Sequence, residues 1–151
     1  MISMSKNENL KNFYIGVMIT SVVGGILLLF TDFAGWYNSG YYVNSWGWVG
    51  PNLDNPLSVI PFLILSCCLF YGTYVSYLGF SDQPVTFKLI NRAFLLSAVV
   101  LAVVFIGALI FVVLEISSDD EWWFDAGFYG GFIGSLLSTV FLYQLKKAST
   151  I

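Results

Sequence analysis

Four long stretches of the chain are apolar and free of charged residues between their bounding charges, over 20, 27, 22 and 20 residues. An α-helix rises about 1.5 Å per residue, so about 20 residues cross a hydrocarbon core about 30 Å thick. None of the stretches alternates as barrel strands do, and backbone in lipid must satisfy its own hydrogen bonds. We therefore predict an all-α integral membrane protein, a four-transmembrane-helix bundle forming one domain over residues 1–151, with spans at about 12–31, 56–80, 93–114 and 124–145.

The composition agrees with this prediction, because 58% of the residues are hydrophobic and 10% are charged. A soluble domain carries about 25% charged residues. The first apolar stretch follows Lys6 and Lys11, as in a signal peptide, but it is longer than such a segment and lacks a small-x-small cleavage pattern after Asp32. We expect it to be a retained span.

The distribution of charge predicts the orientation. All six basic residues lie before the first span, in the loop 81–92 or after the fourth span: Lys6, Lys11, Lys88, Arg92, Lys146 and Lys147. Seven of the nine acidic residues lie in the connections 32–55 and 115–123 or at their ends. The positive-inside rule therefore predicts cytoplasmic N and C termini, with 32–55 and 115–123 as outer loops.

The outer loop 32–55 is rich in aromatic residues and glycine. Asn38-Ser39-Gly40 suggests the turn of a small β-hairpin, and Trp46-Gly47-Trp48 alternates as a strand does. The loop could lie on lipid headgroups, cover the end of the bundle, or bind a partner through aromatic anchors. The candidate interface residues are Trp36, Tyr41, Tyr42, Trp46 and Trp48.

Small residues recur at four-residue spacing in the spans, where close backbone approach drives helix association. The candidate helix-packing residues are Gly127, Gly130, Gly131 and Gly134 in the fourth span, and Gly72 and Ser76 in the second. We expect these residues to close the four-helix bundle, with the seam of a homodimer as the alternative. Asn55-Pro56 offers a side-chain cap and a first-turn proline for the second span.

Reaction chemistry is sparse. The chain has no histidine, and no span carries a charged residue in its middle. Five carboxylates crowd the second outer connection, but they lack the EF-hand spacing and fit a solvated turn: Glu115, Asp119, Asp120, Glu121 and Asp125. We therefore predict no catalytic residue, no metal site, no cofactor, no nucleic-acid binding and no soluble small-molecule substrate.

Topology and the Gly47-Trp48 pair carry a resemblance to a known superfamily. Four spans with a longer first outer loop, an aromatic residue before Gly47-Trp48 and a short second outer loop resemble the claudin and peripheral-myelin-protein tetraspans. The loop here is shorter than in that superfamily and lacks its cysteine pair. The resemblance implies a tetraspan bundle with an adhesion-like role.

These observations favour a non-enzymatic multi-pass protein of the cell membrane that acts as a scaffold, as an adhesion-like protein or as an accessory subunit. Its expected partners are the lipid bilayer and either further copies of itself or other membrane proteins. The alternative is a small oligomeric channel or transporter with a hydroxyl-lined path, for which the candidates are Ser66, Thr73, Ser76, Ser97, Ser135 and Thr139.

The orientation can be tested with single cysteines in a background without Cys67 and Cys68. Cysteines at Ser45 and Ser118 should react with an impermeant thiol reagent on intact cells, because both positions lie in predicted outer loops. A cysteine at Ser149 should react only after the membrane is opened. Reaction at position 149 on intact cells would contradict the predicted topology.

Overall fold

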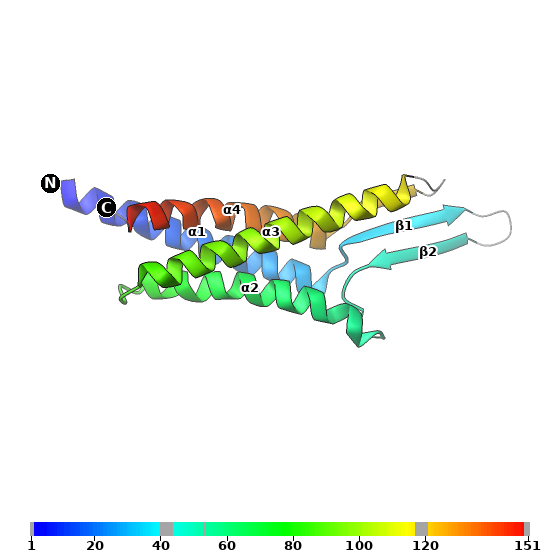
Figure 1. Cartoon of the computed structure of the whole chain (residues 1–151), viewed down its shortest axis with the longest axis horizontal. Coiled ribbons are helices and arrows are strands. Elements are labelled where there is room, and N and C mark those ends of the chain that lie inside the picture. Colours follow the sequence, from blue (N-terminus) through cyan, green and yellow to red (C-terminus); the bar gives the residue numbers. More distant parts are fainter. Residues whose placement is uncertain (1, 40–43, 53, 117–120, 150–151) are drawn as a thin grey trace.

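The computed structural model describes residues 2–39, 44–52, 54–116 and 121–149. Figure 1 shows long helices with a small sheet at one end. The elements follow the order α1 (Ile2–Phe30), β1 (Ala34–Ser39), β2 (Asn44–Val49), α2 (Pro56–Phe80), α3 (Phe87–Glu115), β3 (Glu121–Phe124) and α4 (Ala126–Ala148). In the described residues, four helical segments are long and apolar enough to cross a membrane, as predicted: Leu10–Phe30, Pro56–Phe80, Phe87–Glu115 and Ala126–Ala148.

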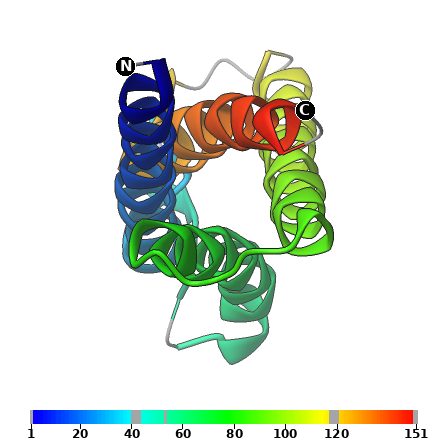
Figure 2. The same ribbon diagram turned by 90° about the vertical axis from the view of Figure 1, so that its left-hand side faces the viewer.

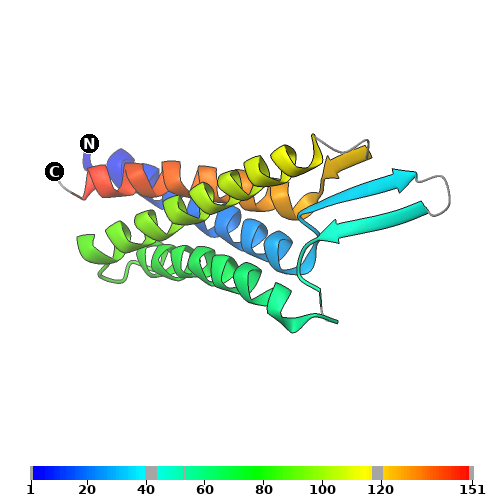
Figure 3. The ribbon, with the colours of Figure 1, turned by 45° about the vertical axis from the view of Figure 1, so that its right-hand side comes forward.

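The four helices form a closed ring when they are viewed along their axes (Figure 2). Helix α1 packs most extensively against α4 and then against α2, whereas α2 and α3 make the weakest of the four neighbouring contacts. Both termini and the α2–α3 connection lie at one end, which we call the terminal end. The strands lie at the opposite end, which we call the sheet end (Figures 1 and 3).

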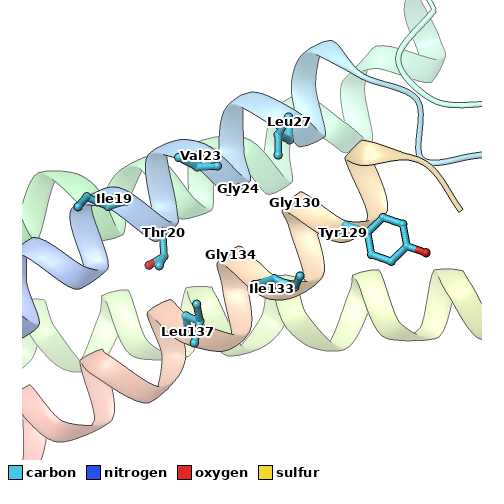
Figure 4. Close-up of a pocket in the computed structure, with 10 residues that line it drawn as sticks. All are labelled: Ile19, Thr20, Val23, Gly24, Leu27, Tyr129, Gly130, Ile133, Gly134 and Leu137. Carbon is cyan, nitrogen blue, oxygen red and sulfur yellow. The ribbon is translucent and has the colours of Figure 1, made fainter.

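Glycines bring the backbones of α1 and α4 together. A Cβ atom on Gly134 would lie 2.8 Å from the Gly24 Cα atom and 2.8 Å from the Thr20 carbonyl oxygen. One on Gly130 would overlap Leu27, and one on Gly131 would lie 2.6 Å from Leu28 Cδ2. Figure 4 shows this seam, with Gly24 of α1 facing Gly130 and Gly134 of α4. Only a residue without a side chain permits so close an approach, which in lipid maximises van der Waals contact.

Hydroxyl groups add hydrogen bonds between the helices about halfway along the bundle. On the seam, the Ser138 Oγ atom lies 2.7 Å from Thr20 Oγ1 and 2.8 Å from Ser21 Oγ. Other bonds join the remaining helices: Ser66 Oγ donates to the Gly25 carbonyl at 2.8 Å, Ser97 Oγ to the Ser135 carbonyl at 3.1 Å, and Thr139 Oγ1 to Ser97 Oγ at 3.0 Å. Ser21, Ser97 and Ser138 separate two apolar clusters, one toward each end of the bundle.

The sheet continues the antiparallel packing of α1 and α4. Strand β1 follows α1, strand β3 precedes α4, and the two pair antiparallel, so that the strand order is β2-β1-β3. Two backbone hydrogen bonds hold the segment between α1 and β1 against the start of α4. Gly127 N–H donates to the Asp32 carbonyl at 2.9 Å, and Asp125 N–H donates to the Phe33 carbonyl at 3.0 Å.

The expected hairpin is present as β1 and β2, but the predicted position of its turn is wrong and one further strand was not predicted. Asn38 and Ser39 are not turn residues, because they pair within the ladder with Ser45 and Asn44. The third strand, β3, was not predicted at all, since four residues beside a helix are too few to show a strand pattern.

The start of α2 also differs from expectation. Asn55 precedes the helix but its side chain makes no capping bond, and instead its carbonyl accepts from Ser58 Oγ at 2.8 Å. Pro56 occupies the first turn, as predicted, and Pro61 lies inside the helix. A proline there cannot donate to the carbonyl four residues earlier, which favours a bend. Toward the sheet end, α2 diverges from α3 (Figures 1 and 3).

The glycine seam predicts unequal effects of one added methyl group. We expect Gly134→Ala to lower the free energy of unfolding by about 1–3 kcal/mol, because the Cβ would press on the backbone of α1. Gly107→Ala on α3 is the matched control, since its Cβ would meet only Phe33 Cζ, at 3.9 Å. Thermal melts in a mild detergent compare the two variants. Equal melting temperatures of the two variants would show that the backbones of α1 and α4 are not in close contact at Gly134.

Candidate functional site

The register of the sheet assigns its side chains to two faces. Gly35 lies between Trp48 and Trp123, and Tyr37 lies between Trp46 and Glu121, so these residues share one face. The alternate rows share the other face: Trp36 between Gly47 and Trp122, and Ala34 between Val49 and Phe124. Each face therefore combines residues of both connections at the sheet end.

The face with Trp36 packs on the bundle. Its rings surround Phe111 of α3, whose ring centroid lies 6.4 Å from that of Trp36, 6.0 Å from Trp122 and 5.7 Å from Phe124. Gly47 is required in this row, because a Cβ at that position would fall inside the Trp36 indole. This inner face fixes the sheet to the end of α3.

Among the described residues, the opposite face carries four rings, those of Tyr37, Trp46, Trp48 and Trp123, and we call it the aromatic face. The ring centroid of Trp46 lies 4.5 Å from that of Tyr37 and 6.3 Å from that of Trp48. The indole planes of Trp46 and Trp48 are only 12° apart. Trp123 meets Trp46 at 6.0 Å and Trp48 at 5.7 Å, in both cases edge to face. Trp46 is 62% exposed and Trp48 is 51% exposed. Such ring pairs contribute about 0.5–1.5 kcal/mol each beyond burial, so the cluster holds its own shape while its surface stays open.

Gly35 makes this cluster possible. It stands in the central strand between Trp48 and Trp123, and a Cβ there would lie 2.9 Å from Trp48 Cε3 and 2.8 Å from Trp123 Cζ2. The two indoles therefore fold over the bare backbone of β1 and reach each other across it.

The structure divides the predicted interface residues. Trp46 and Trp48 lie together on the aromatic face, as their spacing predicted. Trp36 lies on the inner face, against Phe111. Tyr41 and Tyr42 lie outside the described residues. The sequence interpretation did not include Trp123 or the role of Gly35, because both depend on the pairing of β3 (Glu121–Phe124) with β1, which no sequence pattern signalled.

The predicted packing residues all lie inside the bundle. Gly130, Gly131 and Gly134 face α1, and Gly127 faces the carbonyl groups of Thr31 and Asp32 just beyond its end. Gly72 faces the Ser21 hydroxyl, to which a Cβ would lie 3.2 Å away. Ser76 is also buried, and its hydroxyl and that of Thr73 have no hydrogen-bond partner among the described residues. The other hydroxyl candidates for a pore bond to neighbouring helices or their own helix: Ser66, Ser97, Ser135 and Thr139. The channel alternative stays a prediction.

Two carboxylates mark the base of the sheet. Asp125 caps α4, with its Oδ1 atom accepting from Ala126 N–H at 2.7 Å. Burial, and next the negative charge of Asp125, raise the pKa of Asp32 above its ordinary value of 3.8. Within the described ranges, no three His, Cys, Asp or Glu side chains are placed to hold a metal ion.

Comparison of the chain with protein-family models, with curated proteins and with solved structures finds no match. The resemblance to the claudin and peripheral-myelin-protein tetraspans therefore stays an expectation from topology and from Gly47-Trp48. The aromatic face has to be interpreted from its own geometry.

The raised pKa of Asp32 predicts a pH dependence of stability. The folded chain binds this proton more tightly than the unfolded chain does, so the stability should fall as the pH rises from about 3.8 through the raised pKa. Asp32→Asn removes this dependence. We expect the melting temperature of the variant to match that of the parent near pH 3.5 and to exceed it at pH 7. A variant that is less stable at pH 7 would contradict the assignment.

Proposed function

We propose that the protein is a multi-pass protein of the cell membrane that acts, without catalysis of its own, as a scaffold or accessory subunit. It binds a partner protein in the same membrane through the aromatic face. The sheet end lies outside the cell and both termini lie in the cytoplasm.

The aromatic face is the observation that carries this proposal. Clustered, rigid and half-exposed Trp and Tyr side chains are typical of the centres of protein interfaces, where they supply large contact area at low cost in conformational entropy. Rings that only anchor a protein in headgroups form belts around its perimeter. Here four rings gather on one side of one sheet, and their mutual contacts hold them in place before any partner arrives.

The charge distribution supports the orientation. Five acidic residues of the sheet end lie among the described residues, and the whole sequence has no basic residue between Lys11 and Lys88 or between Arg92 and Lys146. The terminal end holds the basic residues, including Lys11, whose Nζ atom lies 2.9 Å from Asp82 Oδ2 in an exposed ion pair. Basic residues on one side only are what the positive-inside rule requires of a cytoplasmic side.

A photo-crosslinking amino acid in place of Trp46 tests the partner. In native membranes it should give one discrete protein adduct, and Trp48→Ala should weaken that interaction about 30-fold, since loss of one central indole costs about 2 kcal/mol or more. The matched control is the same amino acid in place of Tyr143, which is 53% exposed on α4 at the other end.

The control should give no such adduct, and Trp48→Ala should still unfold cooperatively, with a melting temperature lowered only by the loss of the ring contacts to Trp46 and Trp123. Adducts with lipid alone from position 46 would mean that the aromatic face rests on the membrane, and partner binding would be rejected. A lowered melt with an unchanged adduct would make Trp48 a stabilising residue only.

A further inference from the structure

A groove of about 310 Å³ opens between α2 and α3 at the sheet end. Phe62 and Leu65 form its α2 wall, Gly107 and Leu114 belong to its α3 wall, and Phe33 and Phe111 also line it. Every described side chain that lines the groove is apolar. It lies where α2 diverges from α3, along the sides of two helices long enough to cross a membrane (Figures 1 and 3).

Gly107 differs from the other described helical glycines. In a membrane, a glycine usually lets a neighbouring helix approach closely, as Gly24 and Gly134 do across the α1–α4 seam. No described part of the chain approaches Gly107: a Cβ there would find only the Phe33 Cζ atom, at 3.9 Å. The missing side chain therefore clears a space that this chain does not fill.

The dimensions of the groove restrict what can fill it. Along α3 it extends from Val103 to Leu114, which at 1.5 Å per residue is about 16 Å, close to half of a hydrocarbon core about 30 Å thick. A transmembrane helix of a partner would run through the whole core, about twice that length. One acyl chain extends through a single leaflet, so its length matches that of the groove.

We infer that this groove holds one acyl chain of a membrane lipid from the leaflet at the sheet end. The acyl chain lies along α3 over Gly107, between the rings of Phe62 and Phe111, and the headgroup of the lipid lies beyond Leu114. Acyl chains surround both helices in a bilayer, and their insertion restores the dispersion contacts that an empty groove would forfeit. The inference rests on the membrane-spanning arrangement but not on binding of a partner by the aromatic face, so either proposal can fail alone.

Photoreactive phosphatidylcholine with a diazirine on its acyl chain tests the inference in nanodiscs of the full chain. After illumination, mass spectrometry should find label concentrated on the segments around Phe62 and Gly107. Gly107→Leu fills the groove and should reduce this label several-fold. Ala102→Leu is the matched control, because Ala102 is exposed on the same helix but does not line the groove, and its label should equal that of the parent.

Label spread evenly over the lipid-facing surfaces, and insensitive to Gly107→Leu, would overturn the inference. A change in native mass with Gly107→Leu, without a change in label, would assign the groove to a second copy of the chain and would also overturn it. Thermal melts check that each variant folds. Should Gly107→Leu fail to fold, Gly107→Val replaces it as a smaller side chain that still enters the groove, and the same comparisons decide. Crosslinking from position 46 reports separately on the aromatic face.

Discussion

The contact between the backbones of α1 and α4 supports the rest of the molecule. Burial of leucine does not drive helices together in lipid, so close approach at glycine and hydrogen bonds between hydroxyl groups must do so. Gly24 and Gly134 provide the approach, and Ser138 provides the bonds. Because β1 directly follows α1 and β3 directly precedes α4, the same seam also sets the spacing of the two strands that form the centre of the sheet.

The sequence predicted the parts of the fold that depend on composition over long stretches. Four apolar runs define four helices, since only a helix satisfies the backbone over 20 residues in lipid. The alternation of Trp46 and Trp48 predicted a strand with both indoles on one side. The third strand could not be predicted, because its pairing with β1 depends on how α1 and α4 pack. Trp123 therefore joined the aromatic face unforeseen, and Gly35 showed its role only once the register was known.

The sheet separates two surfaces with different chemistry. Its inner side packs on Phe111 and, through Val49, borders the apolar groove between α2 and α3. Its outer side carries the aromatic face, and the backbone of the sheet lies between these two surfaces. A protein bound to one side and a lipid chain bound to the other would not compete for the same atoms. Changes to either surface can therefore be made without altering the side chains of the other.

The seam between the first and the last helix also constrains the order of biosynthesis. A ribosome makes α1 first and α4 last of the four, so α1 is complete while its most extensive contact surface is still unpaired. Strand β1 is made before β3, and until β3 exists the hairpin partner β2 gives β1 only one neighbour. The sheet has all three strands only when β3 has been made. Synthesis of β3 and α4 is thus the step that completes both the bundle and its aromatic surface, and a ribosome stalled before β3 would leave Trp46 and Trp48 without Trp123 beside them.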